Sequence, residues 1–219
     1  MKYLKTVGLT AVAALALMAF VGLGTASATT LCKTGTPEES VCGAGAGKKK
    51  TSATDESITA SSTNSKLTGG SATFNISCTS SSTTVTATGN SGTTVPGEVT
   101  ALSFTGCSTE SGITCTNPSV KNLPYPGSIE AGTGGDSKLK TEKGTEAEPK
   151  IGASIVCGGF VSCEFLTNKA ELTGTNGSPT NFVAKEVNLP KKSGLFCPSA
   201  AKWDGTYNVT SPAGFTVLP

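Results

Sequence analysis

The chain contains no histidine and no arginine, and these two absences exclude several kinds of chemistry. Without histidine, neither a Ser-His-Asp nor a Cys-His catalytic arrangement can form, and no metal can have imidazole ligands. Without arginine, the chain lacks the side chain that most often makes bidentate contacts to bases and phosphates. We therefore expect neither histidine-based catalysis nor a nucleic-acid partner.

The sequence also lacks the short motifs of common enzyme classes. It has no G-x-S-x-G nucleophile motif, no phosphate-binding glycine motif and no Asp/Asn spacing typical of a calcium loop. A glycosidase that uses carboxylates alone needs two acids about 5 to 9 Å apart in a cleft, whereas Glu164 and Glu171 have opposite parity on one predicted strand. We predict no catalytic residue, no metal site and no cofactor, and we keep a carboxylate-based secreted hydrolase as an alternative.

Large aromatic side chains are scarce, and Trp203 is the single tryptophan. Trp203 follows Cys197 closely in the chain, so we expect it to pack near a disulfide in the core. The functional alternative is a stacking platform for a sugar, formed by Trp203 with Tyr125 and Tyr207. These three residues are therefore the candidate ligand-binding residues.

Residues 1–28 have the pattern of a secretory signal peptide. Lys2 and Lys5 precede an apolar stretch over 7–23, and the small-x-small sequence Ala26-Ser27-Ala28 follows it. The alternative is an uncleaved membrane anchor, although the apolar stretch is shorter than the about 20 residues that a span needs. We expect cleavage after Ala28 and no membrane span in the mature chain.

Cys32 lies close to this cleavage site but does not have the sequence context of a bacterial lipid anchor. Such an anchor needs a small residue directly before the cysteine, and here that residue is Leu31. Cleavage would also remove two of the 17 lysines, which leaves 15 lysines against 15 acidic residues. A neutral mature chain is a further argument against nucleic-acid binding.

Eight cysteines lie in the predicted mature chain, and an even number in an exported protein indicates disulfide bonds. The Ser-, Thr- and Gly-rich composition would by itself permit disorder, but the cysteines and the alternating segments argue against it. A zinc site is not expected, because there is no C-x2-C pair and no histidine. The predicted disulfide-bonded residues are Cys32, Cys42, Cys78, Cys107, Cys115, Cys157, Cys163 and Cys197.

The pairing of these cysteines is not determined by the sequence, because eight cysteines allow about a hundred connectivities. Short spacing favours pairs that close a turn or a hairpin, and the two remaining cysteines would then close a long loop. Such a long crosslink would contribute about 4 to 5 kcal/mol in the chain-entropy model. The favoured set is Cys32–Cys42, Cys107–Cys115, Cys157–Cys163 and Cys78–Cys197.

After the apolar stretch, the chain consists of short runs of β-forming residues separated by Gly, Pro, Asn and Ser. The predicted strands are 57–63, 72–78, 83–89, 98–107, 153–157, 163–172, 181–189, 205–211 and 214–218. In the segment 98–107 the apolar residues change parity between Ala101 and Leu102, which indicates a β-bulge. The regular turn signals are typical of an all-β sandwich or barrel, and we predict one disulfide-stapled β-sandwich of about nine strands over 29–219.

The segment 130–150 differs from the rest of the chain in composition. It is charged, lacks aromatic residues and contains Leu139 as one of its few aliphatic residues. We interpret it as an exposed loop or a long hairpin tip, and the alternative is a boundary between two subdomains.

Three stretches carry a resemblance to a known group of proteins: MKYLKTVGLTAVAALALMAFVGLGTASATTLC (1–32), GEVTALSFTGC (97–107) and LFCPSAAKWDGTYNVTSP (195–212). Together they resemble uncharacterised small secreted proteins that occur in many variant copies in soil actinobacteria. The resemblance implies export and a β-rich, disulfide-bonded domain, and it implies no activity and no site residues.

These observations lead to a functional expectation. We expect a secreted or envelope-associated structural or binding protein without catalytic activity, whose partner is a glycan or protein of the cell envelope or the extracellular space. The alternatives are an extracellular carbohydrate-binding module that uses the three aromatic residues and the carboxylate-based hydrolase.

Overall fold

The computed structural model describes residues 28–43, 47–70 and 74–219. The predicted signal peptide, apart from Ala28, therefore lies outside the described residues. The strands are β1 (Thr29–Thr34), β2 (Lys48–Lys50), β3 (Glu56–Ser62), β4 (Ser65–Thr68), β5 (Asn75–Ala87), β6 (Ser91–Gly92), β7 (Val95–Thr109), β8 (Ser119–Lys121), β9 (Tyr125–Ala131), β10 (Asp136–Glu142), β11 (Ile151–Cys157), β12 (Val161–Thr167), β13 (Lys169–Thr175), β14 (Asn181–Ser193), β15 (Ala200–Ser211) and β16 (Thr216–Leu218). Two short 3-10 helices are η1 (Ser40–Cys42) and η3 (Thr133–Gly135).

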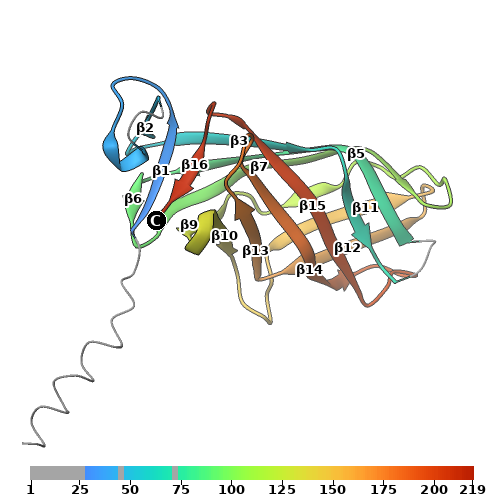
Figure 1. Cartoon of the computed structure of the whole chain (residues 1–219). Coiled ribbons are helices and arrows are strands. Elements are labelled where there is room, and N and C mark those ends of the chain that lie inside the picture. Colours follow the sequence, from blue (N-terminus) through green and yellow to red (C-terminus); the bar gives the residue numbers. More distant parts are fainter. Residues whose placement is uncertain (1–27, 44–46, 71–73) are drawn as a thin grey trace, which may run out of the picture.

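The main body is a closed antiparallel barrel (Figure 1). Each neighbour in the order β5–β7–β9–β10–β13–β14–β15 is hydrogen-bonded to the next, and β3 and β4 both pair with β15 and with β5. The strands β3 and β4 therefore fill the eighth position of the barrel in two pieces. The all-β fold is confirmed, but the predicted sandwich of about nine strands is wrong in its architecture.

Three features of the strands allow the barrel to close: they are long, their buried and exposed residues alternate, and they contain β-bulges. In β13, Ala170 and Leu172 are buried while their neighbours Lys169 and Glu171 are exposed, so this strand presents one face to the interior. The expected bulge is confirmed in β7, where Thr100 has no partner between the pairs Val99–Val85 and Ala101–Thr84. Bulges increase the local twist of a sheet, so strands of 12 to 15 residues such as β5, β7, β14 and β15 can curl into a barrel.

A second small sheet covers one end of the barrel. It has the order β16–β1–β2, with β6 also paired to β1 (Figure 1). Leu31 and Val217 from this sheet are fully buried and belong to the same core as the barrel residues. The hydroxyl of Thr29 accepts a hydrogen bond from the Ala131 amide at 2.9 Å and joins β1 to the end of β9.

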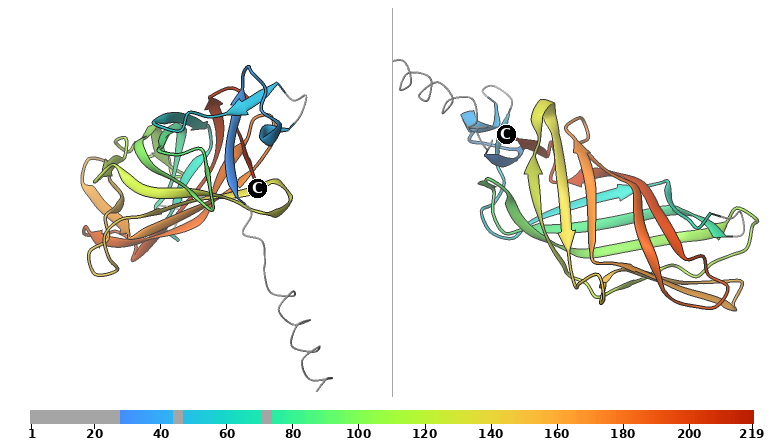
Figure 2. Two further views of the ribbon diagram at one scale, coloured as in Figure 1. Left: turned by 90° about the vertical axis from the view of Figure 1, so that its left-hand side faces the viewer. Right: turned by 90° about the horizontal axis from the view of Figure 1, so that it is seen from below.

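Three strands extend the barrel at its opposite end. β12 pairs with the last residues of β14, β11 pairs with β12, and β8 pairs with β11 (Figure 2). The predicted strand 163–172 is thus two consecutive strands with a bend at Asn168 between them. Both run antiparallel to β14, β12 along its end and β13 along its beginning. A composition that is β-forming throughout does not reveal this break.

The charged segment 130–150 contains the end of β9 and the whole of β10, so part of it belongs to the sheet instead of forming an exposed loop. β10 lies between β9 and β13, and its residues Ser137, Leu139 and Thr141 point into the core. The lysines of β10 alternate with these residues, so they lie on the outer face. Residues 143–149 form the exposed turn region that the composition indicated.

All eight cysteines are in disulfides, as predicted, but only one of the four favoured pairs is present. The favoured pair Cys32–Cys42 is confirmed. The other three bonds are Cys78–Cys107, Cys115–Cys157 and Cys163–Cys197, so the remaining favoured pairs are wrong. Cys78 and Cys107 lie opposite each other on β5 and β7, because sheet pairing brings together residues that are distant in the sequence. Four disulfides indicate an oxidising environment.

Among the residues that the structure describes, none of the helices is long and apolar enough to cross a membrane.

Candidate ligand cavity in the barrel

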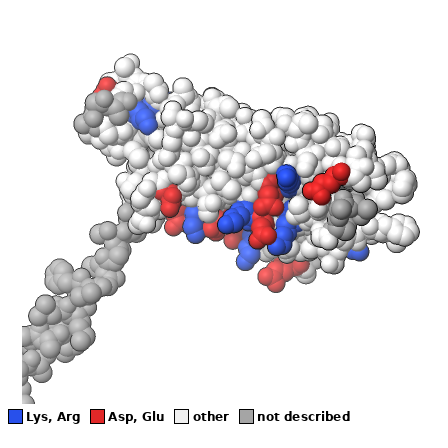
Figure 3. All heavy atoms as spheres, turned by 45° about the vertical axis from the view of Figure 1, so that its right-hand side comes forward, with Lys and Arg blue, Asp and Glu red and all other residues white. Residues whose placement is uncertain are grey.

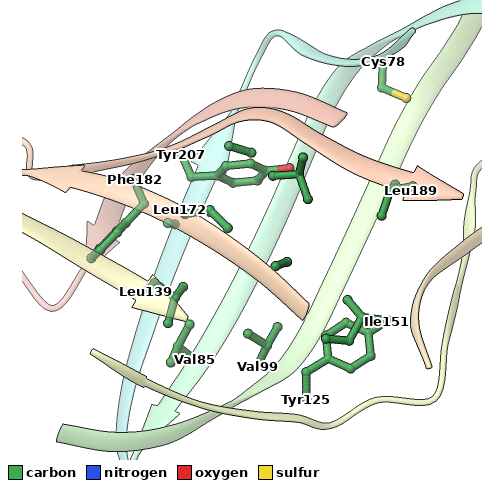
Figure 4. Packing of buried hydrophobic residues seen from close by; sticks show 14 of the residues in the cluster. Cys78, Val85, Val99, Tyr125, Leu139, Ile151, Leu172, Phe182, Leu189 and Tyr207 are labelled. Atoms are coloured by element: carbon green, nitrogen blue, oxygen red, sulfur yellow. The ribbon is translucent and has the colours of Figure 1, made fainter. Parts of the chain in front are cut away.

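The barrel interior contains an apolar cavity of about 100 Å³. Its lining comes from ten strands, and its larger side chains include Leu67, Ile76, Val99, Leu102, Phe104, Tyr125, Leu139, Ile151, Ile155, Phe165, Leu172, Leu189, Trp203 and Tyr207. Figure 4 shows Val99, Tyr125, Leu172 and Tyr207 pointing into the interior from different strands. An apolar cavity of this size offers a dry site to an apolar group.

The cavity does not extend through the whole barrel. Near the small end sheet, Val85, Ile129 and Phe182 are buried and do not line the cavity, so this half is filled by side chains. Toward the other end the lining includes small residues such as Ala153 and Ala170. The hollow part therefore lies in the half that carries β8, β11 and β12.

A cluster of buried hydroxyl groups lines one side of the cavity. The Tyr207 hydroxyl accepts a hydrogen bond from Ser81 at 3.2 Å and lies 3.2 Å from the hydroxyl of Ser65, which is also hydrogen-bonded to Ser81. Burial raises the pKa of Tyr207, and its polar contacts with Ser65, Ser81 and the Trp203 indole act in the opposite direction. The Tyr207 hydroxyl is thus held neutral, as a polar point in an otherwise apolar lining.

Trp203 lies beside this cluster on β15. Its ring packs edge-to-face on Tyr207, with ring centroids 5.7 Å apart, and on Phe104, with centroids 6.5 Å apart. Its indole N–H is buried near the Tyr207 hydroxyl and makes no hydrogen bond of good geometry among the described residues. A buried donor without a partner costs about 1 to 3 kcal/mol, so a hydrogen-bond acceptor on a bound molecule would be favourable here.

The cavity wall is thin along a seam between β7 and β8. β7 pairs with β9 only over Val95–Val99, and β8 is the last strand of its sheet. In the described part of the chain, the β7 edge over residues 100–106 therefore has no strand partner on this side. Leu102 and Phe104 of β7 and Pro118 and Ala153 across the seam are partly exposed, and all four line the cavity. The seam is the place where a ligand could reach the interior.

Both ends of the seam are closed by specific contacts. At one end, the Tyr125 hydroxyl donates to the Lys121 carbonyl at 2.6 Å and also lies 3.2 Å from the Gly152 carbonyl, which ties β9 to β8 and β11. Burial raises the pKa of Tyr125. At the other end, the Cys115–Cys157 disulfide ties the loop after β7 to β11.

The three aromatic residues proposed from the sequence all line this cavity, but they do not form an exposed platform. Tyr125 and Tyr207 are 2% and 1% exposed, and Trp203 is partly buried between Phe104 and Tyr207. Sequence reasoning missed Leu102 and Phe104 as site residues. The signal for them was the parity change at the bulge, which turns both side chains inward beside the seam.

The acidic residues considered for hydrolysis do not face each other. Glu164 on β12 accepts a hydrogen bond from Ser193 at 3.2 Å, and Glu171 on β13 forms an ion pair with Lys138 at 3.0 Å. Within the described part of the chain, no group of three or more His, Cys, Asp or Glu residues is placed to hold a metal ion.

Charged side chains gather in a band on one side of the molecule, as Figure 3 shows. The exposed ion pairs on the outer surface of the barrel are Lys138–Glu171, Lys140–Glu130 and Lys202–Glu186. Both signs alternate along the band, so it presents no single-sign surface to a charged ligand.

No family model, no curated protein and no solved structure matches this chain.

Proposed function

We propose that the protein is a secreted, non-catalytic binding protein that holds an apolar ligand inside the barrel. The observation that carries the proposal is the apolar cavity with its seam between β7 and β8. Small antiparallel barrels hold single small ligands in this way, and well-packed proteins contain few voids larger than a water molecule. The signal-peptide pattern and the four disulfides support secretion.

The chemistry of the lining selects the class of ligand. An aliphatic chain or a small hydrocarbon ring matches the Leu, Ile, Val and Phe side chains, and the hydrophobic effect favours its transfer from water. One hydrogen-bond acceptor on that ligand, such as a carbonyl or a hydroxyl group, would lie near Trp203 Nε1 and the Tyr207 hydroxyl. We therefore propose an amphiphile with a short apolar body and a single uncharged polar group.

Isothermal titration calorimetry with phenol, a small probe with one ring and a single uncharged polar group that is comparable in size to the cavity, tests this function. We expect saturable binding of one probe per wild-type molecule. Ala170→Leu adds an isopropyl group that projects into the cavity, so it should weaken probe binding at least tenfold. The matched control is Ala101→Leu, which adds the same groups on the exposed outer face of β7, next to the cavity-lining Leu102.

Two results would overturn the proposal. One is equal probe binding by wild type and Ala170→Leu in a variant that remains folded by circular dichroism. The other is hydrolase turnover by the purified protein that a single acidic substitution abolishes, since this would favour the carboxylate-based alternative. Saturable binding of a soluble glycan that depends on Trp203 would instead favour the carbohydrate-binding alternative.

A further inference from the structure

The large apolar side chains that are exposed gather mostly at one end of the barrel. Among the described residues, the exposed large hydrophobic side chains are Val41, Ile113, Phe160, Leu195 and Phe196. Phe160 is 81% exposed, Leu195 81% and Phe196 90%. We call Ile113, Phe160, Leu195 and Phe196 the apolar tip; Val41 lies apart from it, beside the small end sheet.

The apolar tip is built from three separate turns. Ile113 lies in the loop after β7, Phe160 in the β11–β12 turn, and Leu195 with Phe196 in the loop between β14 and β15. Ile113, Phe160 and Phe196 line one open surface groove of about 630 Å³, together with Phe74 and Pro198. The three turns therefore meet at the end of the barrel opposite the small end sheet (Figure 1).

The exposure of these side chains is enforced by covalent and steric constraints. The Cys115–Cys157 and Cys163–Cys197 disulfides hold the turns on both sides of the groove. Gly194 has φ +118°, and a Cβ there would collide with the Ser162 carbonyl and the Cys197 sulfur. Phe196 itself has φ +61°, which is uncommon for a bulky residue. The loop thus holds an aromatic ring in water at a conformational cost.

Positive charge lies next to the apolar tip. Lys191 and Lys192 are both exposed at the end of β14, and the Lys191 ammonium group lies 3.4 Å from the Cys197 carbonyl of the same loop. Glu164 also contacts this loop, through its hydrogen bond with Ser193. Protruding Phe and Leu side chains flanked by lysines are the features with which proteins attach to the interface of a lipid layer.

We propose that the apolar tip docks on a lipid surface that carries anionic headgroups. Phe160, Leu195 and Phe196 insert at the boundary of headgroups and acyl chains, and Lys191 and Lys192 contact the anionic groups beside them. The side chains project from separate turn tips, so a soft lipid layer can surround each of them, whereas a second copy of this chain would have to provide a matching pocket for each. This inference does not require the cavity to hold a ligand.

Vesicle flotation of the oxidised, secreted protein tests the proposal. We expect wild type to float with vesicles of phosphatidylcholine and phosphatidylglycerol and to bind pure phosphatidylcholine vesicles more weakly. The affinity of Phe160→Ser/Phe196→Ser for these vesicles should be at least tenfold lower, because this variant has no aromatic rings to transfer from water into the lipid at these two positions. Lys191→Ala/Lys192→Ala should lose about fivefold per lysine at low salt and much less at high salt.

Matched controls separate the apolar tip from general surface effects. Val41→Ser removes an exposed apolar side chain from the other end, and Lys169→Ala/Lys185→Ala removes two exposed lysines from the outer face of the barrel. Both controls should bind vesicles like wild type. Leu195→Trp should show an additional emission component that brominated lipid quenches.

Three outcomes would overturn the proposal. These are the absence of vesicle binding at either lipid composition, equal losses in the controls and the tip variants, and wild-type dimers in sedimentation that Phe160→Ser/Phe196→Ser dissociates. Probe binding in the barrel is measured without vesicles, so a failure of docking leaves the proposed function standing. Conversely, vesicle binding without probe binding would remove the proposed function and keep the docking surface.

Discussion

Phe74 and Phe165 pack edge-to-face with ring centroids 5.4 Å apart, and together they separate the cavity from the groove at the apolar tip. Phe165 lines the cavity, whereas Phe74 lines the groove. Both rings are buried, at 1% and 5% exposure respectively. The pair is thus the end wall of the cavity, and the seam beside β7 is its thin side wall.

Replacing Phe74 by Leu should open this end wall. We expect a loss of about 1 kcal/mol in the free energy of unfolding, because a smaller apolar group remains. We also expect faster exchange of bound phenol in NMR line-shape measurements. Phe182→Leu is the matched control, since Phe182 is also 5% exposed but does not line the cavity. Equal probe exchange rates in the two variants would show that Phe74 does not form the end wall of the cavity.

Tyr125→Phe should loosen the seam at the end where β9 meets β8 and β11. The variant loses the hydroxyl that bonds Lys121 and Gly152, which we expect to cost about 1 to 2 kcal/mol. Hydrogen exchange of the backbone amides in β8 and β11 should increase, while that in β13 should not. The idea that Tyr125 holds the seam fails if exchange increases uniformly over the barrel.

The ion pair between Glu56 and Lys33 predicts a pH dependence of stability. Burial of the Glu56 carboxyl opposes ionisation, but hydrogen bonds from Lys33 Nζ and the Ser52 amide outweigh it, so the pKa of Glu56 lies below its ordinary value of 4.5. A lowered folded-state pKa contributes stability above pH 4.5, and this contribution is lost as the pH falls through the folded-state pKa.

Glu56→Gln measures this contribution. We expect the variant to be less stable than wild type by about 2 kcal/mol at pH 7, and the difference should shrink below pH 4.5. Urea unfolding at several pH values gives both quantities. Glu171→Gln, which breaks an exposed pair with Lys138, should change stability little at any pH; a loss as large as that of Glu56→Gln would contradict the assignment.

Removing the Cys163–Cys197 disulfide should act on both stability and the apolar tip. Cys163→Ala/Cys197→Ala opens a crosslink between residues 34 apart, which is worth up to about 4 kcal/mol in the chain-entropy model. We also expect faster amide exchange around Leu195 and Phe196. Cys32→Ala/Cys42→Ala spans only 10 residues and should cost about 3 kcal/mol without changing exchange at the apolar tip.

A peptide map under non-reducing conditions checks the connectivity itself. We expect linked peptides for Cys78–Cys107 and Cys115–Cys157. A linked peptide that contains Cys157 and Cys163 would contradict the structure and restore the pairing that the short spacing favoured.

The alternation of apolar and polar residues, which is a local property, was sufficient to predict an all-β chain and the bulge in β7. The even cysteine count, together with the signal-peptide pattern, was likewise sufficient to predict that all eight cysteines are bonded. The same reasoning identified Tyr125, Trp203 and Tyr207 as candidate ligand-binding residues, because few other side chains in the chain are large.

The closure of the sheet, the disulfide partners and the cavity depend on contacts between residues far apart in the chain. β12 and β13 run one after the other along β14, and β3 and β4 close the barrel on β15. The pairing of β5 with β7 places Cys78 opposite Cys107, and closure of the barrel turns the rings of Tyr125 and Tyr207 inward instead of outward. The two-residue alternation of apolar and polar side chains determines which face of a strand is buried. Only the assembled barrel determines what that face encloses.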